Sequence, residues 1–247
     1  MARPSKKRQQ ANLPETIKET AWRQIAATGA SSLSLRGIAR ELGITAPAIY
    51  NYFPDRDALV TALIIDAYAS FGDRQIDAMN SIPGPGKELE RLRATGHAYR
   101  AWALDHPHRY LLIFGNPVPG YVPPVQELLP VMMRSISALT STIGEFYALG
   151  MIEPQGIPLP QVEQSQGFCD TMAKGDETML TVLSVALLIW SRVHGLVSLE
   201  ITGKLPPFAN NGAALFEFEL DSIARQFVRP LQAALNTAPS PETGDQP

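Results

Sequence analysis

The stretch SLRGIARELGITAPAIYNYFPDRDAL, residues 34–59, decides the fold that the sequence predicts. Ser34 can cap a short helix that runs to Leu42, and Gly43 can end it because glycine adopts the left-handed conformation without strain. A second short helix follows, which Thr45 can cap and Pro54 ends. Two short helices joined by a tight corner are typical of a helix-turn-helix, whose second helix enters the major groove of DNA. The stretch therefore predicts a DNA-binding element.

The outer face of the second helix carries the side chains that we expect to meet DNA. The hydroxyls of Tyr50 and Tyr52 can donate to phosphate, and Arg36 in the first helix can reach a guanine edge or a phosphate. Each has a plainer alternative, which is core packing for the tyrosines and a solvated surface charge for the arginine. The residues expected at the DNA are Arg36, Thr45, Ala46, Pro47, Ala48, Tyr50, Asn51, Tyr52 and Arg56.

The first 60 residues are basic although the whole chain is acidic. They carry nine Lys and Arg against five Asp and Glu, whereas the remaining residues carry 12 against 19. This asymmetry favours an anionic partner for the front end only. Residues 1–12 are expected to form a flexible arm, in which Lys6, Lys7 and Arg8 either contact phosphate or the minor groove or simply keep the protein soluble.

Nearly all of the remaining sequence shows helical periodicity, so the fold class that we predict is all-α. After the arm we expect a helix-turn-helix domain over 13–60, a larger helical domain over 61–235 and a disordered tail over 236–247. The helix that Asp55 can cap, running to about Asn80, is expected to join the two domains as a lever. The further helices that we expect cover 87–104, 106–114, 125–149, 176–203 and 212–235.

The sequence lacks the signals of several other classes of protein. Cys169 is its only cysteine, and no histidine pair, phosphate loop or nucleophile elbow is present. We therefore expect no catalytic site, no metal and no cofactor. The longest apolar run, 179–190, is too short to span a bilayer, and the basic start is not followed by an apolar stretch. A cytoplasmic protein without a membrane partner is expected.

Residues 14–62 resemble the DNA-binding signature of the tetracycline-repressor-like (TetR) family of bacterial regulators. The resemblance is carried by the stretch quoted above and by Ala21 and Gly29 in the helix before it. The segment WSRVHGLVSLEITGKLP, residues 190–206, resembles a C-terminal domain type of that family that is marked by Trp, His and Gly.

The resemblance implies that residues 45–52 form the recognition helix, with Tyr50 on the DNA backbone and Arg36 near the bases. Arg56 stands where the family commonly has lysine, which would keep a contact to phosphate. Ala46 and Ala48 offer no side-chain hydrogen bond, so base reading would depend on other side chains, on thymine methyl groups and on DNA shape.

Large aromatic residues in the helical body either fill a core or line a cavity for a mostly apolar ligand. The family resemblance implies such a cavity. His194 lies four residues after Trp190 and shares its helix face, so it donates a hydrogen bond to a ligand or, as we expect, to a neighbouring backbone carbonyl. The candidate ligand-binding residues are Tyr99, Trp102, Tyr110, Phe114, Phe146, Trp190 and His194.

The last two predicted helices are long and apolar, and in the resembling family such a pair meets its two-fold mate in a four-helix bundle. The candidate interface residues are Leu187, Phe216, Leu220, Ile223 and Phe227. The function predicted is a homodimeric repressor that binds a near-palindromic operator and is released by a small, mostly apolar effector. One alternative is a constitutive or architectural DNA-binding dimer without a ligand. Another is a helical enzyme or carrier, against which the basic front end argues.

Overall fold

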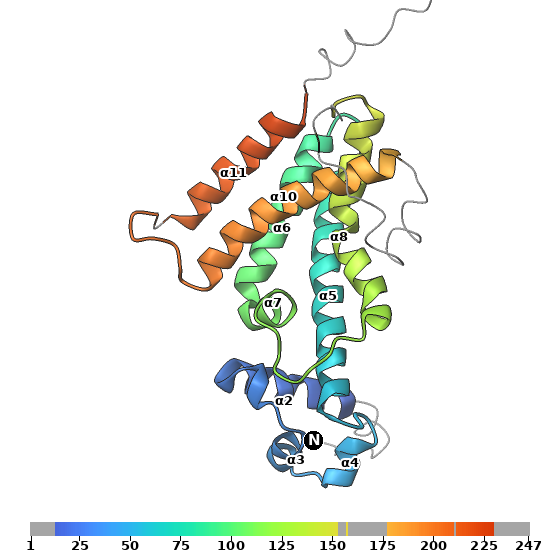
Figure 1. Ribbon diagram of the computed structural model, residues 1–247, viewed down its shortest axis with the longest axis vertical. Helices are drawn as coiled ribbons and strands as arrows, with labels where there is room; N and C mark the ends of the chain where they lie inside the picture. Colours follow the sequence, from blue (N-terminus) through green and yellow to red (C-terminus); the bar gives the residue numbers. More distant parts are fainter. Residues whose placement is uncertain (1–12, 153–156, 158–176, 210, 230–247) are drawn as a thin grey trace, which may run out of the picture. The chain divides into compact units, whose positions relative to one another are not determined.

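The computed structural model describes residues 13–152, 157, 177–209 and 211–229. In these ranges every regular element is a helix (Figure 1), which confirms the predicted all-α class. In chain order the elements are α2 (Leu13–Thr28), the 3-10 helix η1 (Ala30–Ser32), α3 (Leu35–Leu42), α4 (Ala46–Tyr50), α5 (Arg56–Asn80), α6 (Glu88–Asp105), α7 (Pro107–Phe114), α8 (Val125–Ala148), α10 (Glu177–Ile201) and α11 (Gly212–Phe227).

The chain divides into two compact units, each made of two segments. Unit 1 is Met1–Asp73 with Trp102–Ser135, and unit 2 is Arg74–Ala101 with Ile136–Pro247. This division differs from the boundary that we expected after residue 60. The reason is that apolar side chains of α7 and of the loop after it pack against the core of the DNA-binding helices.

Local capping sets the ends of the helices in unit 1. The Ser34 hydroxyl accepts a hydrogen bond from the N–H of Gly37 at 3.3 Å, which confirms the predicted cap of α3. Gly43 ends α3 with φ 65°, a conformation that favours glycine. The carboxylate of Asp55 accepts from the N–H of Ala58 at 2.7 Å and so caps α5 as predicted.

The core of unit 1 fixes the two helices of the helix-turn-helix against their neighbours. Ile38 of α3 and Ile49 of α4 have no exposed surface, and they join Ile17 of α2 and Leu59 of α5 in one apolar cluster. Burial of such side chains stabilises the fold by about 1.5–3 kcal/mol each. The polar face of α4 is thereby held toward solvent.

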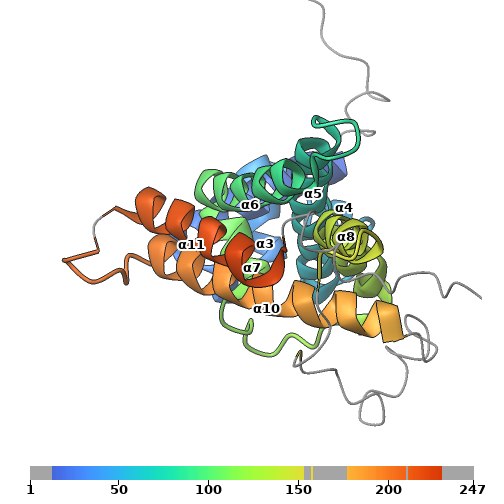
Figure 2. The same ribbon diagram turned by 90° about the horizontal axis from the view of Figure 1, so that it is seen from above.

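In unit 2, α10 and α11 lie side by side in both views (Figures 1 and 2). Arg192 of α10 is hydrogen-bonded to Glu219 and, at 3.0 Å, to the hydroxyl of Ser222 in α11. Gly96 of α6 leaves room for Leu220, because a Cβ at Gly96 would lie 2.8 Å from the Leu220 side chain. This side of α11 therefore packs on α6.

The last helix is shorter than predicted. It ends at Phe227, and Val228 has the extended dihedrals φ −118° and ψ 115°. Pro230 explains the difference, since proline disfavours helical dihedrals in the residue before it and cannot donate a backbone hydrogen bond. Residues beyond Arg229 lie outside the described part of the chain, as do the predicted arm and tail.

Helix α10 contains the longest apolar run and is longer than that run. Its segment Thr178–Ile201 has a mean hydropathy of 1.7 and could cross a membrane by length and composition alone. It is also held by polar contacts to its neighbours, such as the pair between Arg100 of α6 and Glu200. We interpret α10 as the core helix of unit 2, as the sequence predicted.

Candidate nucleic-acid interface

The side chains predicted at the DNA lie on the outer face of the helix-turn-helix. Tyr50 and Tyr52 are 40% and 39% exposed, unusually high values for large aromatic residues, whereas Ile49 between them and the core is fully buried. Ala46 and Ala48 are half-buried. The exposed members of the predicted set are Arg36, Thr45, Pro47, Tyr50, Asn51 and Tyr52.

Thr45 stands at the N-cap position of α4, but its side chain makes no capping hydrogen bond. The capping role that we expected for this hydroxyl is therefore wrong. Its exposed position at the start of the recognition helix leaves the hydroxyl available to a base or a phosphate.

Two of the basic side chains in the first 60 residues form ion pairs within the chain. The ammonium of Lys18 lies 2.8 Å from Glu15 and 2.6 Å from Asp66. Arg23 donates to Glu41 at 3.0 Å, and this hydrogen bond lowers the pKa of the Glu41 carboxyl. These pairs tie α2 to α5 and to α3, so both cations already have an internal partner.

Arg36 and Arg40 are the cations of α3, and both are exposed. Within the described ranges neither makes an ion pair. Because they are four residues apart, they lie on the same helix face. The sequence analysis missed Arg40, although its spacing from Arg36 is the signal that could have found it.

Arg56 does not face the solvent in the way that the predicted phosphate contact requires. Its guanidinium donates to the backbone oxygens of Ala30 at 3.1 Å, Ser31 at 3.5 Å and Pro119 at 3.3 Å, and its Nε atom is buried. These contacts favour a structural role for Arg56 over the predicted phosphate contact, and its Nη1 also lies 3.8 Å from the carboxylate of Asp57. Lys6, Lys7 and Arg8 lie outside the described residues.

Three of the predicted ligand-binding aromatics fill the core of unit 1. Trp102 and Tyr110 are 3% and 1% exposed, and the indole N–H of Trp102 donates to the hydroxyl of Ser70 at 2.9 Å. The Phe114 ring lies 5.1 Å from the Tyr110 ring and 5.5 Å from the Phe71 ring. These contacts favour the core-filling alternative for all three residues.

The remaining candidates lie in unit 2. Phe146 is fully buried. The Tyr99 hydroxyl lies 3.0 Å from Nδ1 of His194, so a side chain is one partner of this histidine, for which we expected a backbone carbonyl. The His194 ring also stacks on Trp190 with centroids 4.7 Å apart, and its Nε2 lies 3.3 Å from the Ser198 hydroxyl. Burial lowers the pKa of His194, which favours the neutral imidazole.

The apolar stripe of α11 that we predicted at the dimer interface packs in the chain's own core. Phe216, Leu220 and Ile223 are 1%, 4% and 1% exposed, so they cannot meet a second copy. The sequence showed an apolar stripe but not which partner it packs on. Leu187 of α10 is 58% exposed, as an interface residue should be, whereas Phe227 is half-buried.

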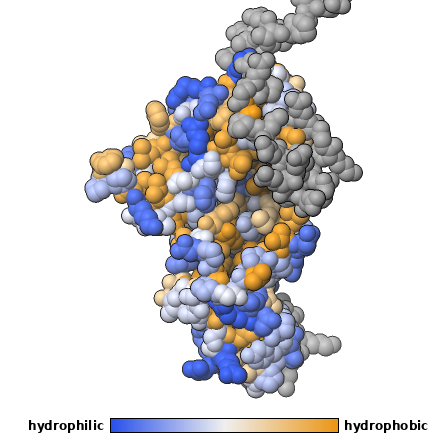
Figure 3. Space-filling model, viewed as in Figure 1, coloured by the Kyte–Doolittle hydropathy of each residue, from blue (hydrophilic) through white to orange (hydrophobic). Residues whose placement is uncertain are grey.

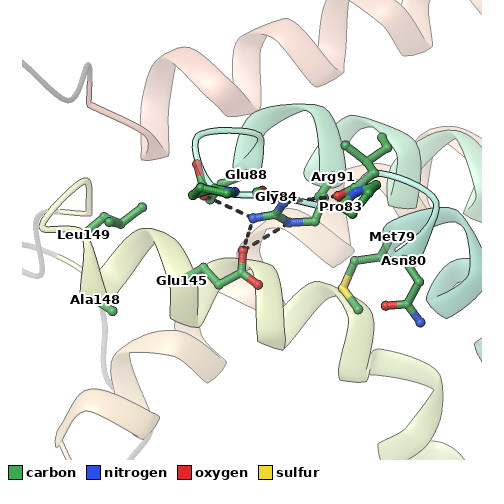
Figure 4. A pocket seen from close by; sticks show the side chains of 11 residues that line it. Met79, Asn80, Pro83, Gly84, Glu88, Arg91, Glu145, Ala148 and Leu149 are labelled. Carbon is green, nitrogen blue, oxygen red and sulfur yellow. Dashed lines mark hydrogen bonds and ion pairs between the residues drawn. The ribbon is translucent and has the colours of Figure 1, made fainter.

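A cavity of about 570 Å³ lies beside the turn between α5 and α6 (Figure 4). Arg91 in its wall donates to Glu145, to Glu88 at 3.1 Å, and to the backbone oxygens of Ile82 and Gly84. Burial alone would raise the pKa of Glu88, but hydrogen bonds from backbone N–H groups and the charge of Arg91 lower it. All five N–H groups of the guanidinium are used, so Arg91 fastens α6 and α8 to the turn and cannot take an anion as well.

Where the structure describes the chain, no cluster of three or more His, Cys, Asp or Glu side chains could hold a metal ion. Cys169 lies outside the described ranges. The exposed face of the helix-turn-helix, with its two unpaired arginines, is accordingly the best-formed candidate site of unit 1.

Two family models match the sequence. Residues 17–63 match the model described as bacterial regulatory proteins of the tetR family, and residues 92–223 match the tetracyclin repressor-like C-terminal domain. The first match contains the whole helix-turn-helix. The second contains most of unit 2 together with α7.

Named relatives agree with these matches. The chain is 33% identical over 196 residues to the HTH-type transcriptional regulator Mb1846 of Mycobacterium bovis, covering 76% of this chain and 80% of that protein. It is 34% identical to the solved regulatory protein SCO4313, with a TM-score of 0.69 over 89% of this chain and 98% of the other. A regulator from Saccharomonospora viridis, solved in complex with choline, shares the fold at 19% identity with a TM-score of 0.61, over 89% of this chain and all of the other. The chain therefore belongs to the TetR family of DNA-binding, helix-turn-helix transcriptional regulators.

Proposed function

We propose that this protein is a homodimeric repressor that binds a near-palindromic operator and releases it when a small effector binds to unit 2. The observation that carries the proposal is the face of α3 and α4. It presents two unpaired arginines and two exposed tyrosines around small side chains that let the helix approach base edges. The protein would act in the cytoplasm, where its operator lies.

Footprinting on the DNA upstream of the protein's own gene tests this proposal. A dimer places its two recognition helices about 34–36 Å apart, or a multiple of that distance, so two protected half-sites of related sequence are expected. Protection of a single, unsymmetrical site would contradict the dimeric repressor, and no protection at any upstream site would contradict autoregulation.

Tyr50 is proposed to donate its hydroxyl to a phosphate. Tyr50→Phe keeps the ring and removes only the hydroxyl, so we expect about a 3- to 10-fold weaker affinity for all duplexes alike. Fluorescence anisotropy with operator and scrambled DNA measures both affinities. A loss confined to one sequence would instead assign Tyr50 to base reading.

The proposed dimer uses an outer stripe of α10 and α11. Leu187, Ser191 and Gly195 follow one another at intervals of four residues and are exposed, and Leu215 and Phe218 are exposed on α11. On the face that Figure 3 shows, apolar surface lies over these two helices. A Cβ at Gly195 would meet no atom within 4 Å, so a second helix could approach closely there.

Leu187→Glu places a charge in the centre of this proposed interface, and we expect it to convert the dimer into a monomer. The matched control is Val122→Glu, which makes the same kind of change at a loop residue of unit 1 that is 82% exposed. Light scattering coupled to size exclusion measures the mass of each variant at one protein concentration. A dimeric Leu187→Glu variant would show that the interface lies elsewhere.

The proposed effector is small and mostly apolar but carries polar groups. Thr95, Thr181 and Ser184 in unit 2 are at most 4% exposed, and among the described residues their hydroxyls have no hydrogen-bond partner. An unsatisfied buried hydroxyl costs about 1–3 kcal/mol, which a bound molecule or water can offset. The Tyr99 and His194 pair beside Trp190 adds a further polar contact in the same unit. The choline complex of the Saccharomonospora regulator supports small-molecule binding by this fold.

A further inference from the structure

Arg56, the first residue of α5, connects two segments of unit 1 that are far apart in sequence. One is η1, before α3, whose residues Ala30 and Ser31 accept hydrogen bonds from Nη2 at 3.1 and 3.5 Å. The other is the loop 115–124 between α7 and α8, where the carbonyl of Pro119 accepts from Nη1 at 3.3 Å. A single guanidinium thus joins the turn that precedes the DNA-reading helices to this loop.

A cavity also lies at this junction, beside the apolar packing of α7 and the loop against the core of unit 1. A cavity of about 370 Å³ separates η1 and the end of α2 from α7 and the loop, and its walls include Ala30, Ser31 and Pro119, the three residues that bind Arg56. The hydrogen bonds of Arg56 therefore add polar contacts to this apolar packing. A further hydrogen bond joins the Tyr121 hydroxyl in the loop to the Thr61 hydroxyl in α5 at 2.8 Å.

We propose that Arg56 is a positioning residue for DNA binding, which fastens the turn before α3 to the loop 115–124 and does not contact phosphate. The loop leads into α8, which contributes to both units. The inference rests on the proposed function for its effect on DNA, whereas the fastening itself is a property of unit 1.

A lysine at position 56 is expected to keep a phosphate contact but to lose the hydrogen bonds to the three carbonyls. A phosphate contact needs only a positive charge, which lysine supplies. Bridging three carbonyls needs donors spread over a planar group, which the compact ammonium of lysine cannot provide. Arg56→Lys and Arg56→Gln together therefore separate fastening from phosphate binding.

Hydrogen–deuterium exchange and DNA binding at several salt concentrations test the proposal in the full-length protein. Both variants should exchange faster than wild type in residues 29–33 and 117–121. Both should bind DNA about 3- to 10-fold more weakly, as expected for lost hydrogen bonds. The slope of log affinity against log salt should stay unchanged, since losing a phosphate contact would reduce it by about 0.9.

Several results would overturn the proposal. The first is an Arg56→Lys variant that exchanges hydrogen and binds DNA like wild type, together with an Arg56→Gln variant whose affinity depends less steeply on salt. The second is faster exchange with unchanged DNA affinity, which would make the fastening irrelevant to binding. If Arg56→Gln does not fold, Arg56→Lys and Tyr121→Phe test the proposal instead. Tyr121→Phe removes the hydrogen bond to Thr61 and should also make the loop exchange hydrogen faster. Failure of wild type to bind any duplex would contradict the proposed function, while the exchange data would still decide the fastening.

Discussion

Arg36→Glu is expected to weaken operator binding by at least about 100-fold. A lost arginine contact to a base edge or phosphate costs about 1–3 kcal/mol, and the new carboxylate adds repulsion from the DNA backbone. Arg36 is exposed in the first turn of α3 and makes no ion pair in the described part of the chain, so the substitution breaks no ion pair there. Anisotropy titrations with operator DNA measure the loss.

Arg74→Glu is the matched control for this experiment. Arg74 is an exposed arginine of unit 2, and its substitution changes the net charge by the same amount. We expect less than about a threefold change in affinity, because exposed charges farther apart than the Debye length of about 8–10 Å are largely screened. Equal losses in both variants would show that Arg36 acts only through net charge. Arg40→Glu should resemble Arg36→Glu if both arginines face the DNA.

Phe216→Ala is expected to lower the free energy of unfolding by about 3–5 kcal/mol, the usual cost of removing a buried phenylalanine side chain. The ring is 1% exposed and is covered by the guanidinium of Arg100 at 5.7 Å from its centroid. Chemical denaturation followed by circular dichroism measures the change. Because the ring belongs to the chain's own core, the loss should be the same at every protein concentration.

Phe218→Ala, two residues further along α11, is the matched comparison. Its ring is 65% exposed, so truncation should change the stability of a single chain by no more than about 1 kcal/mol. In a dimer that uses this face, the loss should grow on dilution, because association stabilises the folded state by mass action. If the loss of stability depended on protein concentration for Phe216→Ala and not for Phe218→Ala, the dimer interface would be the apolar stripe of α11 that the sequence predicted.

The DNA-binding helices could be predicted from the sequence because local chemistry sets them. Ser34 and Asp55 cap their helices as the residue types indicated, and Gly43 has the positive φ that ends α3. The exposure of Tyr50 followed from the same pattern, since Ile49 is the apolar residue that must point inward. Short-range rules sufficed for these helix ends, although the cap expected from Thr45 is not formed.

Contacts between distant segments could not be predicted in this way. An apolar stripe such as Phe216, Leu220 and Ile223 looks the same whether it meets α6 or a second chain. The residues next to Arg56 in the sequence give no indication that the backbone carbonyls of Ala30 and Pro119 will accept its hydrogen bonds. The partner of His194 was missed for the same reason, because Tyr99 is 95 residues away.

The central claim is that the outer face of α3 and α4 recognises a DNA sequence. Anisotropy binding to the DNA flanking the protein's own gene, against a scrambled duplex of equal length and at two salt concentrations, tests it most directly. We predict saturable binding that prefers the native fragment by at least about 100-fold and weakens for both duplexes as salt rises. No binding to either duplex, even at low salt, would contradict the claim.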